Sequence, residues 1–250
     1  VYRQGTHRVV TVEQCLIEDR RAQAIIATVR ELARAFHYPP FDEDRGTGFL
    51  RHALVRAAKT EIMLVLVTAQ TTFPHKAAFL RELLKRHPEL TTVVQNLNDR
   101  RTSMVLGKRE TVLHGKGYIE DALCGMVFRI SPQSFYQVNS AQTEVLYALA
   151  AELAGLTGTE TVLDAYCGVG TIGLSMAGRC RNLIGVELNP DAVRDAQGNA
   201  KRNGITNARF YTGDAGRFLR ACAEERTPVD VLLMDPPRAG SDEIFLQAVL

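Results

Sequence analysis

The stretch DAYCGVGTIG, residues 164–173, decides how the second half of this chain is expected to fold. It overlaps an apolar run that predicts a buried strand, and its glycines form the pattern G-x-G-x-x-G. Such a loop brings backbone N–H groups and a helix N-terminus close to a ligand. Because the loop begins with Asp164, a nucleotide-binding pattern is combined here with a carboxylate.

Strands and helices alternate around this loop, which is typical of an α/β fold with a doubly wound parallel sheet. Ligands of such sheets bind at the carboxyl ends of the strands. Any one acid at a strand end would more often be a helix cap, whereas acids at four successive ends indicate a site. These acids are Asp164, Glu187, Asp214 and Asp235. The predicted strands are 161–166, 182–188, 208–214 and 229–237, and the predicted helices are 141–153, 172–177, 190–204 and 215–224.

The identity of the cofactor depends on Asp164. The glycine pattern serves NAD, FAD or S-adenosylmethionine equally, and Glu187, about 20 residues beyond the first glycine, is placed to accept ribose hydroxyls. A carboxylate at Asp164 would repel a pyrophosphate but suits the ammonium and sulfonium groups of S-adenosylmethionine. The acid therefore favours the methyl donor. The alternative is that Asp164 merely caps the following turn.

The segment DPPRAG, residues 235–240, follows the fourth predicted strand. Its two prolines fix the backbone and lack N–H groups, so the segment cannot continue as an ordinary strand. A rigid turn of this kind would hold Asp235 and Arg238 at the mouth of the cofactor pocket. Rossmann-type methyltransferases often have an acid-Pro-Pro turn in this position. Together with Asp164, the turn disfavours the rival interpretation as a nicotinamide oxidoreductase.

Charge and composition divide the chain into two parts. Residues 1–130 contain 20 Lys and Arg against 14 Asp and Glu, whereas the remaining residues contain 10 against 14. A basic module that meets a polyanion fits this imbalance, and so does an ordinary solvated surface. No apolar run is long enough to span a bilayer, and the five scattered cysteines argue against a disulfide framework. We therefore expect a soluble, cytoplasmic protein with reduced thiols and no membrane partner.

The N-terminal half predicts an α+β module, and we place the boundary near Phe128, between residues 1–127 and residues 128–250. Amphipathic periodicity predicts two helices here, the second of which is interrupted by Pro88. The predicted helices are 23–36 and 77–90, and the strand-like stretches are 7–15, 49–58, 61–69, 91–98 and 112–123.

The segment FRISPQSFYQVNSAQTEVLY, residues 128–147, completes a set of motifs with DAYCGVGTIG, GVELN and DPPRAG. Over nearly the whole chain, these motifs closely resemble the bacterial RNA uracil-C5 methyltransferases. The resemblance implies a truncated Rossmann-type, S-adenosylmethionine-dependent methyltransferase domain preceded by an α+β RNA-binding module. It also implies methylation of carbon 5 of a uridine. HRVVTVEQC and GTGFLRHALVR look more like the 23S rRNA branch, and a tRNA uracil-5 methyltransferase is the alternative.

The resemblance implies six cofactor-binding positions: Gln137, Tyr166, Thr171, Glu187, Asp214 and Asp235. Gln137 would offer its amide to the polar end of the donor, Tyr166 would pack beside it, and Glu187 would hold the ribose. Asp214 would accept a hydrogen bond from the adenine amino group, and Asp235 would lie between donor and substrate. For the glutamine and the threonine, local capping is the alternative.

The chemistry of this family needs a cysteine and a general base. Carbon 5 of uracil is a weak nucleophile, so a cysteine thiolate adds to carbon 6, the resulting enolate accepts the methyl group, and a base removes the carbon 5 proton. The resemblance places the nucleophilic cysteine and a catalytic glutamate after Leu250. We assign none of the five cysteines as the nucleophile, and we expect Cys167 to pack under the glycine loop. The chain should then bind S-adenosylmethionine without methylating RNA.

Cys15 raises the question of a metal site. In the 23S rRNA branch, three closely spaced cysteines and a fourth after a basic strand hold a [4Fe-4S] cluster, and Cys15 stands in the place of the fourth. The other three are absent from this sequence, so we do not expect a cluster in this chain. In a longer protein, Cys15 would be the fourth ligand. A lone cysteine is ordinarily just a small buried residue.

Substrate binding is expected to use the basic half of the chain, with 23S rRNA as the partner and no protein partner implied. We single out Arg51 and Arg56 for contacts with phosphates and Arg238 for the region around the target uridine, which would be flipped toward Asp235. For the second of two basic clusters, a solvated helix face is the alternative. A noncatalytic RNA-binding protein that keeps the cofactor fold is the remaining rival. The clusters are Arg45, Arg51, His52, Arg56 and Lys59, and then Lys76, Arg81, Lys85 and Arg86.

Overall fold

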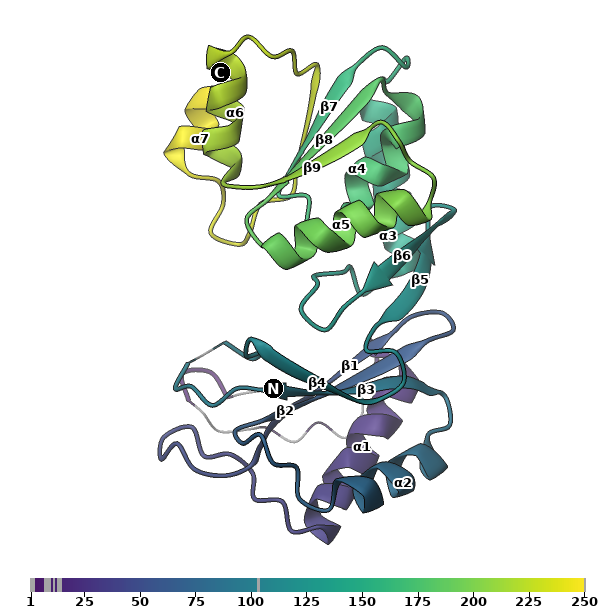
Figure 1. Cartoon of the computed structure of the whole chain (residues 1–250), viewed down its shortest axis with the longest axis vertical. Helices are drawn as coiled ribbons and strands as arrows, with labels where there is room; N and C mark the ends of the chain where they lie inside the picture. The colour runs from purple at the N-terminus through teal and green to yellow at the C-terminus, as the bar shows by residue number, and fades with distance from the viewer. Residues whose placement is uncertain (1–2, 7–9, 11, 13–14, 103, 250) are drawn as a thin grey trace. The chain divides into compact units, whose positions relative to one another are not determined.

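The computed structural model describes residues 3–6, 10, 12, 15–102 and 104–249 of the chain. The chain folds as two compact units, Val1–Ile119 and Glu120–Leu250 (Figure 1). The structure thus divides the chain after Ile119, whereas the sequence places the boundary after residue 127. None of the helices in the described residues is long and apolar enough to cross a membrane.

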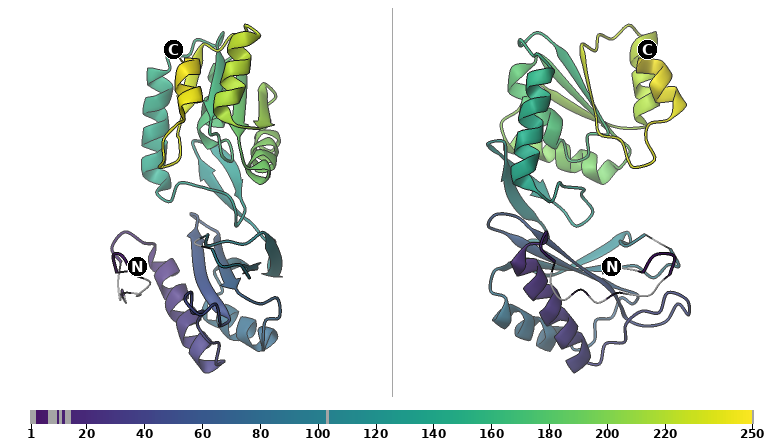
Figure 2. Two further views of the ribbon diagram at one scale, coloured as in Figure 1. Left: turned by 90° about the vertical axis from the view of Figure 1, so that its left-hand side faces the viewer. Right: turned by 180° about the vertical axis from the view of Figure 1, so that it is seen from behind.

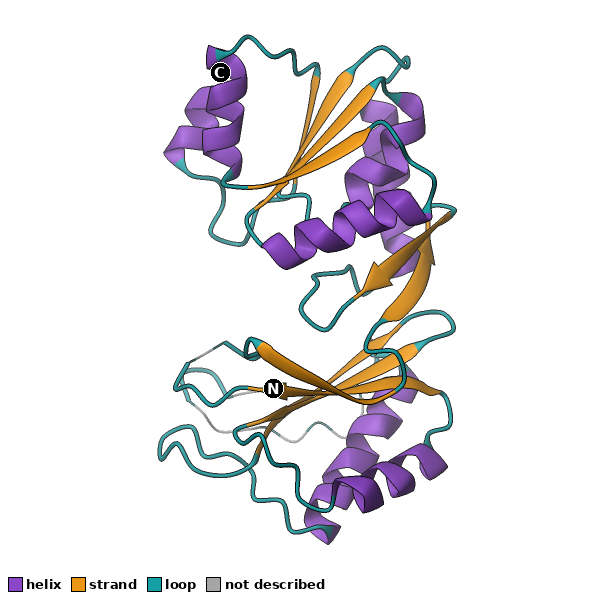
Figure 3. Ribbon diagram, in the orientation of Figure 1, coloured by secondary structure: helices purple, strands orange, loops and turns teal. Residues whose placement is uncertain are grey.

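The first unit is a four-stranded sheet with two helices packed on one face (Figure 3). Strands β2 and β3 are parallel, and the outer strands β1 and β4 pair with them antiparallel. Ile25 and Leu32 of α1, with Phe79 and Leu83 of α2, form the core with one side of the sheet. The elements are α1 (Arg20–Ala35), β1 (Leu50–Ala57), β2 (Ile62–Thr68), α2 (Lys76–Arg86), β3 (Leu90–Leu97) and β4 (Arg109–His114).

The second unit contains a parallel sheet in the order β10-β7-β8-β9 and a separate two-stranded sheet, β5-β6. The elements of the parallel sheet are β7 (Thr161–Ala165), β8 (Asn182–Glu187), β9 (Ala208–Thr212) and β10 (Val231–Met234), and those of the small sheet are β5 (Ile119–Leu123) and β6 (Met126–Ile130). The helices are α3 (Ser140–Leu153), α4 (Thr171–Met176), α5 (Pro190–Arg202), α6 (Ala215–Glu224) and α7 (Glu243–Val249).

Helices cover both faces of this parallel sheet, and Figure 2 shows α3 on one side and α6 with α7 on the other. The alternation of side chains along β7 explains the arrangement: Val162 packs into the cluster with α4 and α5, whereas Leu163 and Ala165 pack with α6 and α7. All five residues of β7 are buried, as expected for a strand with a neighbour on each side. The fold is therefore the doubly wound α/β sheet that the sequence predicts.

Most predicted elements of the second unit are present within a few residues of their expected bounds. The predicted strand 229–237 is shorter, because Pro236 and Pro237 end it and only Val231–Met234 pairs with β7. Strand β6 was not anticipated as an element, since its residues were interpreted only as part of a motif. In the first unit, the strand-like stretch 7–15 falls largely outside the described residues.

Candidate cofactor site at the carboxyl ends of the strands

Asp164 lies at the carboxyl end of β7 and is 1% exposed. Its Oδ2 accepts a hydrogen bond of 2.9 Å from the backbone N–H of Gly173, in the first turn of α4, whereas its Oδ1 is buried without a hydrogen-bond partner among the described residues. Burial raises the pKa of Asp164 to about 7, and the nearby carboxylates of Asp235 and Glu187 add to the rise. One oxygen of Asp164 thus caps the helix, while the other remains for a ligand.

The close contact between Asp164 and α4 depends on Gly173. A Cβ atom at this position would lie 2.8 Å from Asp164 Oδ2 and 2.8 Å from a methyl group of Leu183. Gly170, immediately before α4, adopts a φ of 83°, a backbone conformation that residues with a side chain rarely adopt. The glycines of the loop therefore serve two purposes: one permits the turn, and the other lets the helix approach the acid.

Glu187 is the last residue of β8 and is fixed by two backbone hydrogen bonds. Its Oε2 accepts from the N–H of Gly168 at 3.1 Å, and its Oε1 accepts from the N–H of Asn189 at 2.8 Å. Each carboxylate oxygen has a second lone pair, so both can still accept hydroxyl groups of a ligand. The carboxylate of Glu187 is therefore held directly beside the glycine loop, at the strand end where the sequence predicts it.

A cavity of about 510 Å³ is lined by Gln137, Tyr147, Ile172 and Asp235 together with apolar residues of α3 and β10. Residues 164–171 and Glu187 are not among the residues that line it. Two of the six predicted cofactor positions, Gln137 and Asp235, therefore share one cavity. Gln137 comes from the segment before α3, and Asp235 from the turn after β10. Residues almost 100 positions apart in the sequence are brought together because α3 packs beside the edge of the sheet that β10 forms.

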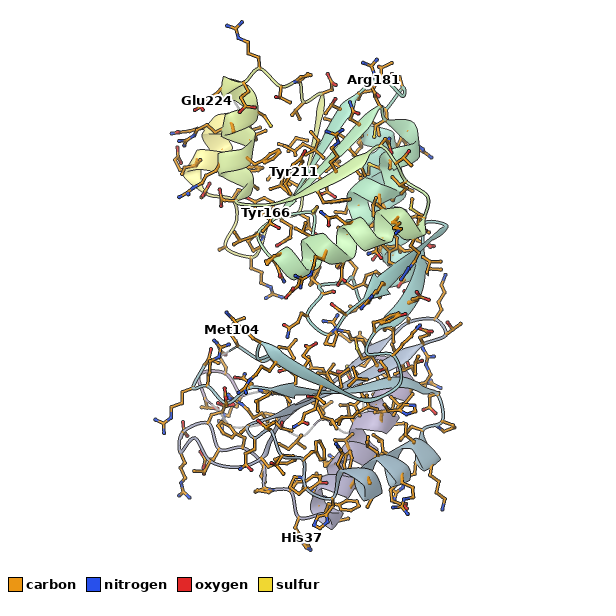
Figure 4. All side chains as sticks on the ribbon, viewed as in Figure 1. His37, Met104, Tyr166, Arg181, Tyr211 and Glu224 are labelled. Carbon is orange, nitrogen blue, oxygen red and sulfur yellow. The ribbon has the colours of Figure 1, made fainter. Side chains whose placement is uncertain are left out.

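The side chain of Thr171 contacts α3, and that of Tyr166 contacts the region of α7. The hydroxyl of Thr171 lies 2.9 Å from the hydroxyl of Tyr147, whose pKa is raised to about 12 by burial. Tyr166 has a positive φ of 63° and donates its hydroxyl proton to Ser241 at 3.1 Å, while its ring packs 5.4 Å from that of Phe245. Figure 4 shows Tyr166 at this end of the sheet, on the side of α6 and α7.

Asp214 and Arg238 stand apart from this network in the described structure. Asp214 is the N-cap of α6, where its Oδ1 accepts from the N–H of Arg217 at 2.9 Å, and its residue is exposed. Arg238 is exposed in the turn that follows the two prolines. Asp214 lies two residues after the end of β9, so it is at the carboxyl ends of the strands, as Asp164 and Glu187 are.

Cys167 is a packing residue in this structure. Its side chain belongs to the buried cluster on the α4 and α5 face, and a Cβ atom at Gly185 would lie 3.0 Å from its sulfur. Burial and the charges of Asp164 and Glu187 raise the pKa of the thiol well above its ordinary value. A thiol of this kind is protonated and inert at neutral pH, as expected for a side chain packed under the loop.

Sequence reasoning missed a set of polar residues on α5 that hold the site together. Asn199 is fully buried, and its amide nitrogen donates to the carbonyl oxygen of Val169 in the glycine loop at 3.1 Å. Asp195 accepts hydrogen bonds from the hydroxyls of Ser131 and Ser134 at 2.8 and 2.7 Å. The spacing of Asp195, Asn199 and Asn203 at every fourth residue was the available signal, since it places three polar side chains on one helix face.

The expectation that Arg51 contacts RNA phosphates is corrected by the first unit. The Arg51 side chain is 0% exposed, pairs with Glu43 at 2.9 Å, and donates to the carbonyl oxygens of Asn98 and Arg100 at 2.8 and 2.7 Å. Its guanidinium also lies 4.2 Å from the ring centre of Phe41. Arg51 therefore joins two loops of the unit and is not available to a phosphate.

The other predicted cations of the first unit differ in exposure. Burial lowers the pKa of Arg56 from its ordinary value, opposed by the charge of Glu110, and burial also lowers the pKa of His52. Arg45 is exposed and lies 3.7 Å from Asp42. The exposed cations are Arg45, Lys59, Lys76, Arg81, Lys85 and Arg86, the last of which pairs with Glu31.

Cys15 is half-buried, and its backbone is hydrogen-bonded to the side chain of Gln23 on α1. In the part of the chain that the structure describes, no group of three His, Cys, Asp or Glu side chains could hold a metal ion. The role of Cys15 as a fourth ligand in a longer protein stays a prediction.

Comparison with known proteins agrees with the geometry of the second unit. Residues 156–246 match a family model described as a methyltransferase domain. This region has the Rossmann-like fold of a methyltransferase. The methyltransferase domain includes the glycine loop, the strand-end acids and the DPPR turn, while Gln137 lies before the matched residues.

Relatives extend the similarity to the whole chain. An uncharacterized RNA methyltransferase of Halalkalibacterium halodurans is 41% identical over all of this chain and 55% of its own length. One from Listeria monocytogenes has the same identity and coverage. The chain therefore spans about half the length of the curated relatives it matches. The solved structure of Pyrococcus abyssi tRNA (uracil-54, C5)-methyltransferase in complex with S-adenosyl-L-homocysteine has a TM-score of 0.79 at 24% identity, covering 99% of this chain and 59% of that one.

Proposed function

We propose that the second unit binds S-adenosylmethionine at the carboxyl ends of β7, β8 and β10. The observation that carries this proposal is the buried Asp164, whose Oδ1 has no hydrogen-bond partner among the described residues and whose pKa is raised by burial and by the nearby carboxylates of Asp235 and Glu187. A cation in this place relieves the repulsion, whereas a pyrophosphate adds to it. The methyltransferase domain match supports the same cofactor.

In this proposal, Glu187 holds the ribose hydroxyls and Asp214 accepts from the adenine amino group. Gln137 offers its amide to the polar end of the ligand, and Asp235, which lines the same cavity, lies between donor and substrate. Tyr166 and Thr171 shape the loop around the ligand. The bound cofactor supplies a methyl group on a sulfonium centre. The chain's own residues orient that centre, keep it away from water and balance its positive charge.

We further propose RNA as the substrate and carbon 5 of a uridine as the methylated atom. Support comes from the relatives named RNA methyltransferases and from the likeness in fold to a tRNA uracil methyltransferase. The resemblance of the N-terminal motifs favours 23S rRNA, and tRNA is the second candidate because the solved relative acts on it. Binding of a 23S rRNA fragment and of a tRNA T-arm by this chain, compared by fluorescence anisotropy, distinguishes the two candidates.

The proposed reaction proceeds through a covalent adduct between uracil and a cysteine, and none of the five cysteines of this chain is that nucleophile. Burial raises the pKa values of Cys167, Cys180 and Cys222 above the ordinary value, and burial with the charge of Glu144 raises that of Cys124. For Cys15, the resemblance implies another role, that of the fourth ligand of an iron–sulfur cluster in a longer protein. The nucleophile and the general-base glutamate would come from outside these 250 residues.

Titration calorimetry with S-adenosylhomocysteine and with NAD tests the cofactor proposal on the 250-residue chain. We expect binding of S-adenosylhomocysteine and none of NAD. NAD binding with no S-adenosylhomocysteine binding would overturn the proposal in favour of an oxidoreductase. Binding of RNA alone would favour the noncatalytic RNA-binding protein. Transfer of a methyl group to a uridine-containing RNA by the chain itself would show that the nucleophile has been misplaced.

A further inference from the structure

We propose that Asn199 is a positioning residue that couples the glycine loop to the segment bearing Gln137. The inference rests on the proposed cofactor site and extends it to a helix that contributes no side chain to the predicted ligand contacts. Asn199 is 0% exposed and has both ends of its amide engaged. Its nitrogen donates to the carbonyl oxygen of Val169 at 3.1 Å, and its oxygen accepts from the backbone N–H of Arg129 at 2.8 Å.

These two bonds join segments that lie 40 residues apart in the sequence. Val169 lies between the glycines of the loop, and Arg129 lies in β6, directly before the segment that leads to Gln137. One buried amide thus spans both. A buried amide that loses one partner is left with an unsatisfied group, so the two bonds are expected to form together.

Two further residues, Asp195 of α5 and its C-cap Asn203, extend the connection to the start of β6 and to the segment that bears Gln137, residues 131–139. Asn203 accepts from the N–H of Val127 and donates to its carbonyl oxygen, each at 2.9 Å, in the manner of a neighbouring strand. Asp195 accepts from Ser131 and Ser134 at the other end of the contact. The side chains of Asn199 and Asn203 therefore form hydrogen bonds with the backbone of β6, as a neighbouring strand would, and Asp195 fixes the start of the segment.

The far end of residues 131–139 is held by a different element. Asp121 of β5 is 4% exposed and accepts from the hydroxyls of Tyr136 at 3.1 Å and Ser140 at 2.9 Å. The segment is thus anchored at both ends, and Gln137 stands next to the second anchor. Gln137 lies between the two residues that Asp121 holds, and Asp121 belongs to the strand that pairs with β6. A shift of β6 relative to α5 would therefore carry β5 with it and displace Gln137 relative to the glycine loop.

Asn199→Ala tests the coupling, with Asn207→Ala as the matched control. The Asn207 amide donates to the carbonyl oxygens of Ala177 and Cys180 at 2.8 and 3.0 Å, so it satisfies comparable groups of the same domain away from these segments. We expect Asn199→Ala to weaken S-adenosylhomocysteine binding about tenfold, which corresponds to about 1.4 kcal/mol. We expect Asn207→Ala to leave the dissociation constant within about twofold, whatever it does to stability.

A double-mutant cycle shows whether Asn199 acts through Gln137. In the Gln137→Ala background, the effect of Asn199→Ala on the dissociation constant should shrink to about threefold or less, because the contact it positions is already gone. Equal losses in both backgrounds would overturn the coupling, and so would equal losses for the Asn199 and Asn207 variants. If Asn199→Ala does not fold, Asn199→Asp, which keeps the acceptor for Arg129 and loses the donor to Val169, replaces it in the cycle.

Hydrogen–deuterium exchange separates this inference from the proposed function. In the unliganded chain, Asn199→Ala should increase exchange in residues 131–139 and in the glycine loop together, while Asn207→Ala should leave both unchanged. An increase confined to one of the two segments would overturn the coupling. Should the unsubstituted chain bind no S-adenosylhomocysteine, the cofactor proposal fails, whereas the exchange result still decides whether Asn199 connects the two segments.

Discussion

The two units use their charged residues in opposite ways. In the second unit, Asp164, Glu187 and Asp235 gather at the carboxyl ends of the strands, and among the described residues an oxygen of Asp164, the most buried of them, has no hydrogen-bond partner. In the first unit, the Arg51 side chain is also buried, and its Nε has no hydrogen-bond partner among the described residues. Its two other nitrogens, however, are engaged by the carboxylate of Glu43 and by two carbonyl oxygens, and the guanidinium packs on an aromatic ring. A buried cation that is paired with a carboxylate indicates a structural role, whereas a buried carboxyl group beside two further carboxylates indicates a place for a cation.

The largest expected effect concerns Arg51, because removing one member of a buried ion pair leaves the other uncompensated. We expect Arg51→Met to lower the free energy of unfolding of the first unit by about 3 kcal/mol. Urea titration followed by circular dichroism measures the loss, and Arg45→Ala, which removes an 82% exposed cation, is the control. If Arg51→Met instead weakens RNA binding without loss of stability, the assignment of Arg51 to the fold is wrong.

A smaller effect is expected at Gly173, where α4 contacts Asp164. Gly173→Ala would force a Cβ atom to within 2.8 Å of Asp164 Oδ2 and of Leu183, and overpacking of this kind costs about 1–3 kcal/mol of stability. S-adenosylhomocysteine binding should weaken as well, because Asp164 has to move. Gly178→Ala is the matched control, since nothing lies within 4 Å of a Cβ atom there. Calorimetry measures the affinity of each variant and thermal unfolding its stability. Equal affinity and equal stability of Gly173→Ala and Gly178→Ala would contradict the prediction.

The difference between the predictable and the unpredictable parts of the site has a physical cause. The strand ends could be derived from the sequence because Asp164 and Glu187 immediately follow apolar runs, and a parallel sheet brings such positions together. The role of Arg51 could not, since its partners Asn98 and Arg100 are almost 50 residues away and the chain's charge pattern says nothing about which way a side chain points. Asn199 was missed for the same reason: its partner in β6 lies 70 residues away.

Asp164 also predicts how the second unit responds to pH. Its pKa in the folded state, about 7, is above its ordinary value, so the folded state binds the proton more tightly than the unfolded state does. The stability contributed by this group is full below pH 4 and is lost as the pH rises towards about 7. Asp164→Asn should remove this loss. Unfolding free energies measured between pH 5 and pH 8 check the slope, with Asp191→Asn, an exposed acid of α5, as the control.

Asp164→Asn should also weaken cofactor binding, so its effect on affinity is expected to be opposite to its effect on stability. A cation favours ionised Asp164, so the affinity for S-adenosylmethionine should rise with pH up to about 7 in the unsubstituted chain. In Asp164→Asn, we expect an affinity about tenfold lower, or 1.4 kcal/mol, and no such pH dependence. A variant that is more stable at pH 8 and yet binds less ligand is the pattern expected of a functional group. Unchanged affinity would reduce Asp164 to a helix cap.

The smallest effect is expected on the exposed face of α2 in the first unit, where charge alone supports a role. If Arg81 contacts a phosphate, Arg81→Ala should weaken binding of an rRNA fragment about threefold and lower the slope of log K against log salt by about 0.7. Fluorescence anisotropy at several KCl concentrations measures both. Arg30→Ala, which removes an exposed cation of α1 outside the two basic clusters, should leave the slope unchanged. An unchanged slope for Arg81→Ala would favour the alternative that the cations of α2 form an ordinary solvated helix face. RNA contacts would then have to be sought among cations, such as Arg56, that are partly enclosed by the fold.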